Sequence, residues 1–275
     1  MTSAALAALG LTLLVTAATS VALLLLTFAV ARRVGRYNVV DVVWGPGFAL
    51  AAVVSLAMSG GYGSTGRKAL LAAATIIWGL RLGGYIAWRS RGKGEDPRYR
   101  EMLDKAPGSR AAYALRKVFL LQAGLIWLIS IPVQAGMFQR GGPAWLVGLG
   151  LVIWLGGLAF ESVGDAQLAR FKSDPAHRGT VMDRGLWRYS RHPNYFGDAC
   201  VWWGLFLISV GSWIGLVAVF SPIAMTFLLA AGSGKPITEQ RLGARPGYAE
   251  YVATTSGFFP LPPRRRARRQ AASRQ

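Results

Sequence analysis

The stretch from Gly185 to Asp198 carries the most varied side-chain chemistry in the chain and comes just before an apolar segment. Its sequence is GLWRYSRHPNYFGD, and its candidate binding residues are Arg188, Tyr189, Arg191, His192, Asn194, Tyr195 and Asp198. Pro193 favours a helix start there, because its fixed φ and missing N–H cost nothing in a first turn. A helix N-terminus preceded by arginines suits an anion such as phosphate. The alternative is a basic loop that only orients the chain in a membrane.

A pair of carboxylates forms a second candidate group. Glu161 and Asp165 are four residues apart, so a helix would direct both to the same side. A ribose diol or an adenine amino group could donate hydrogen bonds to them, whereas the structural alternative is pairing with arginines of neighbouring loops. Arg170 and Lys172 follow, and they offer a bidentate and a point-charge contact to phosphate, respectively.

Arg81 lies inside an apolar segment and is a candidate catalytic residue, together with Asp41 and Tyr85. A buried arginine at membrane depth costs at least about 2.5 kcal/mol, so we expect Arg81 to face the protein interior, with Asp41 as a partner. Tyr85 is on the same helix face and could donate a proton. The alternatives are a structural ion pair for Arg81 and interfacial anchoring for Tyr85.

The elements that must position these residues are transmembrane helices. Hydrophobic residues make up 53% of the 275 residues, and apolar segments recur at about the length that a bilayer requires. The sequence therefore predicts an all-α polytopic membrane protein with seven spans, at residues 4–31, 39–58, 69–88, 117–138, 144–163, 197–212 and 214–232. The first segment lacks a basic flank and is too long for a signal peptide, so we expect it to be retained. Residues 1–260 would form one domain, with the cofactor site mainly in residues 155–260.

The distribution of positive charge predicts the orientation. Of the 31 Lys and Arg residues, all but four fall in segments 32–38, 89–117, 164–194 and 233–275. The exceptions are Arg67, Lys68, Arg81 and Arg140. This asymmetry places the N-terminus outside and the C-terminus in the cytoplasm, which indicates a multi-pass protein of the inner (cytoplasmic) membrane. It also explains the formal charge of +19 without nucleic acid as a partner. The tail, residues 261–275, is expected to be disordered and to bind anionic lipid through its arginines.

The polar clusters all fall on the predicted cytoplasmic side, including a segment with Glu239 after the last span. This indicates a single cofactor site assembled from loops. With one Cys and two His residues, a metal site is not expected. The sequence also lacks the glycine-rich strand-to-helix motif of a dinucleotide-binding domain, so membrane helices and their loops would have to hold any nucleotide. A monomer is expected.

The run 185–198 resembles the C-terminal signature of the steroid 5α-reductase-like superfamily, in its bacterial membrane branch of unassigned activity. Segments 41–44, 78–82, 95–99 and 255–260 fit that branch as well. The resemblance implies a seven-helix fold that binds NADPH among the cytoplasmic ends of its C-terminal helices. It also implies reduction of an enone or other activated alkene in a steroid- or lipid-like substrate that enters from the bilayer.

Site residues follow from the resemblance by position. It implies that Asp165 and Asn194 are nucleotide-binding positions, that Glu161 is a polar adenosine contact, and that Arg170 or Lys172 is a phosphate contact. Adjacent candidates are Arg188, Arg191, His192 and Tyr195. Asp41 is the nearest substitute for the family's substrate-activating acid.

Two alternatives remain open. Arg191-His-Pro-Asn-Tyr195 and Glu239 also match in part the isoprenylcysteine carboxyl methyltransferases, which use S-adenosylmethionine. The third possibility is a non-catalytic lipid-binding membrane protein that keeps the fold without the cofactor. The density of charged and amide side chains on one face speaks against this third possibility.

Overall fold

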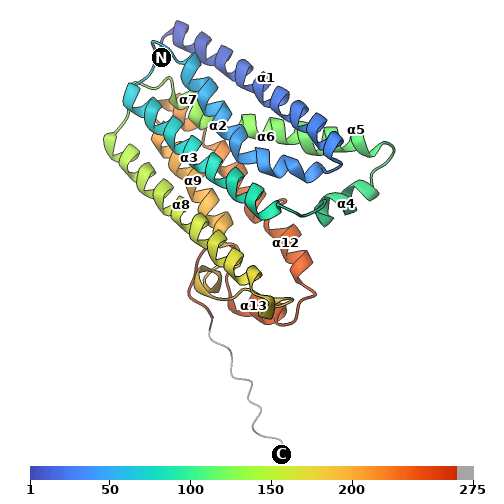
Figure 1. Cartoon of the computed structure of the whole chain (residues 1–275). Coiled ribbons are helices and arrows are strands. Elements are labelled where there is room, and N and C mark those ends of the chain that lie inside the picture. Colours follow the sequence, from blue (N-terminus) through green and yellow to red (C-terminus); the bar gives the residue numbers. More distant parts are fainter. Residues whose placement is uncertain (265–275) are drawn as a thin grey trace, which may run out of the picture. The chain divides into compact units, whose positions relative to one another are not determined.

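The computed structural model describes residues 1–264, and every regular element in that part of the chain is a helix (Figure 1). These residues divide into two compact units. Unit 1 consists of residues 1–154 and 202–224, and unit 2 consists of residues 155–201 with the described residues from 225 onward. Most of the basic tail, from residue 265 onward, lies outside the described residues.

Unit 1 contains the helices of the N-terminal half and one short helix from later in the chain. They are α1 (Ser3–Val34), η1 (Tyr37–Val39), α2 (Val40–Met58), α3 (Thr65–Ser90), α4 (Pro97–Asp104), α5 (Arg110–Ala114), the π-helical turn η2 (Leu115–Leu120), α6 (Leu121–Ile129), α7 (Ile131–Gly136) and α10 (Trp213–Val217). Helix α2 packs against both α1 and α3, and α1 also packs against α6 (Figure 1).

Helices α2 and α3 approach each other closely because glycine stands at their crossing. A Cβ on Gly45 would overlap the carbonyl oxygen of Gly79, and a Cβ on Gly79 would overlap that of Gly45. Small residues of this kind let transmembrane helix backbones come into direct contact. Next to them, Phe48, Trp78 and Trp202 are fully buried, with ring centroids 4.7 to 5.6 Å apart. This aromatic cluster forms the core of unit 1.

Three helices continue from one unit into the other: α8 (Ala144–Ser173), α9 (Pro193–Ser209) and α11 (Phe220–Ala230). The predicted span 144–163 is thus the first part of a 30-residue helix. As a result, the candidate binding residues Glu161, Asp165, Arg170 and Lys172 all lie on one helix, although the predicted span ended at residue 163.

Unit 2 adds four short helical elements: η3 (Pro175–His177), η4 (Gly185–Arg188), α12 (Lys235–Leu242) and α13 (Tyr248–Thr254). Within this unit α8 and α9 are in backbone contact. A Cβ on Gly197 would lie 2.6 Å from the carbonyl oxygen of Gly157 and 2.5 Å from the backbone nitrogen of Glu161. The glycine at position 197 therefore sets the depth at which α9 meets the carboxylates of α8.

Six helical stretches in the described part of the chain are long and apolar enough to cross a membrane, which confirms an all-α, multi-pass membrane protein. They are Ser3–Val34, Tyr37–Met58, Thr65–Ser90, Arg110–Gly136, Ala144–Ser173 and Trp213–Leu242. The remaining predicted span, 197–212, overlaps α9, which has 17 residues and stands at the lower limit of a spanning length.

Candidate functional site

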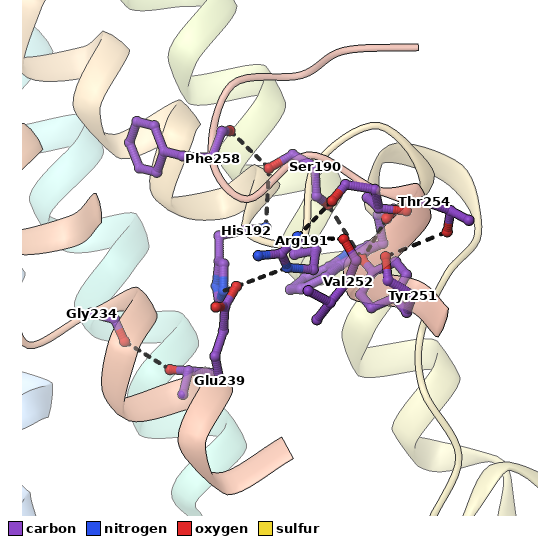
Figure 2. A network of polar contacts seen from close by, with 12 residues as sticks. Ser190, Arg191, His192, Gly234, Glu239, Tyr251, Val252, Thr254 and Phe258 are labelled. Carbon is purple, nitrogen blue, oxygen red and sulfur yellow. Dashed lines mark hydrogen bonds and ion pairs between the residues drawn. The ribbon is translucent and has the colours of Figure 1, made fainter. Parts of the chain in front are cut away.

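The loop before α9 is held in place by the C-terminal segment of unit 2 (Figure 2). The hydroxyl of Ser190 donates a hydrogen bond of 2.8 Å to the carbonyl of Phe258, and the backbone N–H of Arg191 donates one of 2.8 Å to Ser256. The phenol of Tyr251 donates to the carbonyl of Trp187. Burial raises the pKa of Tyr251, which therefore stays a donor at neutral pH. Two segments some sixty residues apart in sequence thus form one support.

Arg191 and His192 converge on one carboxylate oxygen of Glu239, which lies on α12 (Figure 2). The Arg191 Nε donates to Oε1 over 2.8 Å, and the His192 Nε2 lies 3.2 Å from the same oxygen. Arg191 also donates through Nη1 to the carbonyls of Thr255, at 2.6 Å, and Val252, at 3.3 Å. The guanidinium is therefore fixed by three acceptors, on α12 and at the end of α13, and its Nη2 makes no hydrogen bond to the residues that the structure describes.

His192 is held neutral by its surroundings. Its side chain is 3% exposed, and this burial lowers its pKa to about 4, although Glu239 opposes the shift. Arg191 and Lys235 act in the same direction as burial. A neutral imidazole donates through one ring nitrogen only, and its contact with Glu239 uses Nε2. The net charge of Arg191, Lys235, His192 and Glu239 together is therefore +1.

A second cation reaches the same place. A Cβ on Gly257 would lie 2.8 Å from the Nζ of Lys235 and 3.2 Å from the Nη2 of Arg191. The ammonium of Lys235 forms no hydrogen bond or ion pair with residues 1–264 that would hold it in place. Two cationic donors with free N–H groups thus converge on a glycine backbone, which is the arrangement that phosphate oxygens require.

Carboxylate and amide groups form the neighbouring part of unit 2. Glu161 and Asp165 on α8 are 3% and 4% exposed, and Asp198 on α9 is 7% exposed. The amide of Asn194 donates a hydrogen bond of 3.2 Å to Asp165 Oδ1. The buried carbonyl oxygen Oδ1 of Asn194 accepts none within the described chain. The carboxylates and the amide oxygen of Asn194 could therefore accept hydrogen bonds from hydroxyl or amino groups of a ligand.

A continuous run of four residues connects the two groups. His192 stacks on Tyr195, with ring centroids 5.1 Å apart and planes 7° from parallel. The phenol of Tyr195 lies 3.3 Å from the hydroxyl of Thr238, on the helix that carries Glu239. Asn194 stands between these aromatic residues in sequence and contacts α8. The cation cluster and the carboxylate cluster are therefore neighbours within unit 2.

The other candidate binding residues lie at the surface. The side chains of Arg170, Lys172, Arg188 and Tyr189 are exposed, and the backbone carbonyl of Tyr189 accepts a hydrogen bond from Leu261. Their assignment stays a prediction.

The candidate catalytic residues lie in unit 1. Asp41, at the start of α2, accepts a hydrogen bond of 2.5 Å from the phenol of Tyr99 and pairs with Arg98 over 3.3 Å. Burial and the Asp41 carboxylate raise the pKa of Tyr99 well above its ordinary value, so the phenol stays protonated. Arg98 is held in turn by Asp96, at 3.0 Å. The partner of Asp41 is thus Arg98 of α4, where we had suggested Arg81, because the loop before α4 folds back over the start of α2.

That loop is bound through backbone groups. The carboxylate of Glu95 accepts hydrogen bonds from the N–H groups of Tyr37, at 2.6 Å, and Asn38, at 2.9 Å. Tyr85, one helical turn from the end of α3, has the guanidinium carbons of Arg81 and Arg89 at 5.8 and 5.6 Å from its ring centroid. Arg81 and Tyr85 are therefore neighbours on one helix face, as their spacing predicts.

Sequence reasoning missed several residues of these sites. Lys235, Thr238 and Gly257 complete the cation cluster, and Tyr99 completes the Asp41 pair. The signal for Lys235 was its position in a Gly-Ser-Gly-Lys-Pro run at a helix start. Among residues 1–264 no group of three or more His, Cys, Asp and Glu side chains is placed to hold a metal ion.

Comparison with protein-family models matches residues 27–255 to the family described as "Protein of unknown function (DUF1295)". Comparisons with curated proteins and with solved structures gave no match. The matched region includes the Asp41 pair, the carboxylates of α8, the loop before α9 and Glu239. Because this region covers well over half of the chain, the membrane protein described here belongs to the DUF1295 family.

Proposed function

We propose that this protein is a membrane-embedded, NADPH-dependent reductase of a carbon–carbon double bond in a steroid- or lipid-like substrate, as its resemblance to the steroid 5α-reductase-like superfamily implies. One observation carries the proposal. In unit 2, the free donors of Arg191 and Lys235 converge on Gly257, next to the Asp165–Asn194 pair. A site in which cationic side chains lie next to buried hydrogen-bond acceptors suits a ligand with both phosphates and hydroxyl groups. A nucleotide is such a ligand.

The roles of individual residues follow from their contacts. Arg191, fixed by Glu239 and two carbonyls, would bind phosphate oxygens through Nη2 without reorganising, and Lys235 would add a mobile point charge. Glu161, Asp165 and Asn194 would accept and donate hydrogen bonds to ribose or amide groups. His192 would keep its neutral ring stacked on Tyr195 and so position the loop.

The reducing chemistry would come from the bound NADPH, which supplies hydride. The protein side of the reaction would lie with Asp41, Arg81 and Tyr85. A phenol or a guanidinium could donate a hydrogen bond to the substrate carbonyl, and a phenol could supply the proton that completes the reduction. The hydrophobic substrate would enter from the bilayer.

We further propose seven spans, with α9 as the additional one. The N-terminus would lie outside and the C-terminus in the cytoplasm of an inner membrane, where NADPH is available. The protein would act as a monomer, bind no nucleic acid and hold its basic tail against anionic lipid. The support for this orientation is the positive charge of the loops that carry the cofactor residues.

The decisive experiment is a thermal-shift titration of the purified protein with NADPH, NADH and S-adenosylmethionine. We expect NADPH to raise Tm. Lys235→Gln should leave the Tm without ligand unchanged, because Lys235 makes no hydrogen bond, and should weaken NADPH binding about tenfold through the lost charged contact. Arg178→Gln removes the same charge from an exposed loop position and serves as the matched control. Equal affinity in both variants would remove Lys235 from the site.

The second candidate is an S-adenosylmethionine-dependent methyltransferase of the isoprenylcysteine carboxyl methyltransferase type. The observation in its favour is that Arg191 and His192 meet on Glu239, since these are the residues that match that family in part. Stabilisation by S-adenosylmethionine alone would establish this candidate in place of the reductase. No stabilisation by any of the three ligands would favour the non-catalytic lipid-binding protein.

A further inference from the structure

A buried cation without a protein counter-charge lies in unit 1. Arg67, in the first turn of α3, is 8% exposed. Its side chain makes no hydrogen bond, ion pair or ring contact with the described residues, and its Nη1 is fully covered without a partner. A buried charge left in this state costs several kcal/mol, so such groups are normally compensated.

The surroundings of Arg67 are backbone and hydroxyl groups. A Cβ on Gly211 would overlap the Nη1 of Arg67, and a Cβ on Gly142 would lie 3.0 Å from its Nη2. Next to Gly211, the Oγ of Ser212 is also buried and has no hydrogen-bond partner in the described part of the chain. The guanidinium therefore lies in a nook lined by Gly142 and Gly211 and by the carbonyl oxygens of Val210 and Gly141, and Ser212 follows Gly211 in the chain. Neither glycine could be larger without displacing it.

No carboxylate is available to this nook from the helices that meet there. The sequence has no Asp or Glu between Asp41 and Glu95, between Asp104 and Glu161, or between Asp198 and Glu239. Helix α2 places Asp41 about 27 Å from its other end at Ser59, and the rise of α9 places Asp198 about 16 Å from Ser209. The acids of these helices are thus at their far ends.

The remaining charges near the nook are positive. Lys68 donates to the carbonyl of Ser59 over 3.0 Å, and Arg140 donates to the carbonyl of Gly61 over 3.0 Å. The first turn of α3 adds the positive end of a 26-residue helix, and its N-cap residue Ser64 provides no side-chain cap. Three cations and one uncapped helix N-terminus therefore create a positive potential without a compensating acid.

We propose that Arg67, the backbone of Gly142 and Gly211 and the hydroxyl of Ser212 form a binding site for a phosphate group. The ligand is either the phosphodiester of a membrane phospholipid or free inorganic phosphate. The Nε and Nη2 of Arg67 would bind two phosphate oxygens in a fork, because its Nη1 is covered by protein, and the Ser212 hydroxyl would donate to a third. The site is independent of the proposed cofactor, because all its residues belong to unit 1, whereas Arg191 and Lys235 belong to unit 2. A failure of the reductase proposal would leave it intact.

Thermal unfolding of the delipidated protein in detergent tests this site. Inorganic phosphate and dioleoylphosphatidylglycerol are titrated separately, at constant ionic strength set by sodium chloride. We expect a rise in Tm that continues with the logarithm of the phosphate or lipid concentration, as stabilisation by binding requires. Arg67→Gln should abolish the rise, whereas Arg140→Gln, an exposed cation of the adjoining loop, should keep it. A rise with lipid alone identifies the lipid as the source, and a rise with inorganic phosphate identifies the free ion.

Two further variants keep the test decisive if Arg67→Gln does not fold. Ser212→Ala removes one proposed donor with little change in volume and should weaken binding several-fold. Arg67→Met should raise Tm in phosphate- and lipid-free detergent, since it removes a buried charge, and should respond to neither ligand. A wild-type protein that responds to neither phosphate nor lipid overturns the proposal, as does a Ser212→Ala variant with wild-type affinity for both.

Discussion

Arg191 and His192 are adjacent in sequence and share one oxygen of Glu239, at 2.8 and 3.2 Å. Of the two, only Arg191 carries a charge at neutral pH, because burial holds the pKa of His192 at about 4. Glu239 thus neutralises Arg191 while His192 completes the packing. The phosphate affinity that we propose for the cluster therefore depends on how much of the positive charge Glu239 leaves free.

Glu239→Gln should strengthen phosphate binding and weaken the fold. The change removes the one carboxylate from a cluster with two cations, so the affinity for NADPH should rise. The lost ion pair is partly exposed and should cost about 1 to 2 kcal/mol of folding free energy. Thermal unfolding with and without NADPH measures both effects. Glu250→Gln, at an exposed position of α13, is the control for net charge. A weaker NADPH affinity in Glu239→Gln would show that the carboxylate contacts the ligand directly.

The stability of the protein should fall on acidification because of His192. The pKa of this residue is lower in the folded protein, at about 4, than the value of 6.5 in the unfolded chain. The stabilisation is thus fully present above pH 6.5 and is lost between pH 6.5 and 4, where the unfolded chain binds more protons. The shift corresponds to about 3 kcal/mol. Comparison of Tm from pH 4 to 8 for the wild type and His192→Gln measures this contribution. The wild type should lose it between pH 6.5 and 4, and the pH profile of the variant should lack this loss.

The Asp165–Asn194 contact should respond to a change of charge. Asn194→Asp places two carboxylates where a hydrogen bond of 3.2 Å now stands, so it should destabilise the protein at pH 8. The penalty relative to wild type should shrink as pH falls towards 5 and one carboxyl takes up a proton. Asn194→Ala, which loses only the hydrogen bond, should show a penalty that does not vary with pH. Parallel curves for the two variants would contradict the contact between the two side chains.

Gly197→Ala should damage the site through packing alone. The added methyl group would lie 2.6 Å from the Gly157 carbonyl oxygen and 2.5 Å from the Glu161 backbone nitrogen, well inside van der Waals contact. Helix α9 must therefore move away from α8. Overpacking of this kind costs about 1 to 3 kcal/mol. Gly156→Ala, one residue from the contact and with open space around its Cβ position, is the matched control and should leave Tm unchanged or raise it. An equal effect of both substitutions would contradict the contact.

The Asp41–Tyr99 pair of unit 1 should be separable from nucleotide binding. Tyr99→Phe removes the donor to Asp41 and should destabilise the protein by about 1 kcal/mol. Asp41→Asn should cost more, because it also weakens the pairing with Arg98, and the double variant should cost less than the sum because both changes remove the same Tyr99–Asp41 hydrogen bond. Stabilisation by NADPH should be the same in all three variants. If turnover is measured, Asp41→Asn and Tyr85→Phe should slow it.

Features that depend on neighbouring residues were predictable from the sequence. Segment length and hydropathy identify the long helices, and a spacing of four residues places Glu161 with Asp165, and Arg81 with Tyr85, on common helix faces. The helix start at Pro193 was correct for the same reason, since a proline sets the local backbone.

Features that depend on residues far apart in sequence were not predictable. Asp41 was paired with Arg81, but a loop held by Glu95 brings Arg98 to it. Lys235 and Gly257 are 22 residues apart, and nothing in their local sequence indicates that they meet. The end of α8 was placed about ten residues too early, because its last turns are polar and are stabilised by tertiary contacts, to which hydropathy is blind.

The hydrogen bonds from Ser190 to Phe258 and from Arg191 to Ser256 also bear on how the protein is made. A ribosome synthesises the loop at 185–192 well before it synthesises the residues that hold that loop. The nascent chain therefore carries an unsupported loop and an uncompensated Arg191 until residues 239–258 have emerged and folded back. The transmembrane helices can insert during this interval, so insertion into the membrane and completion of the site are separate events in biosynthesis.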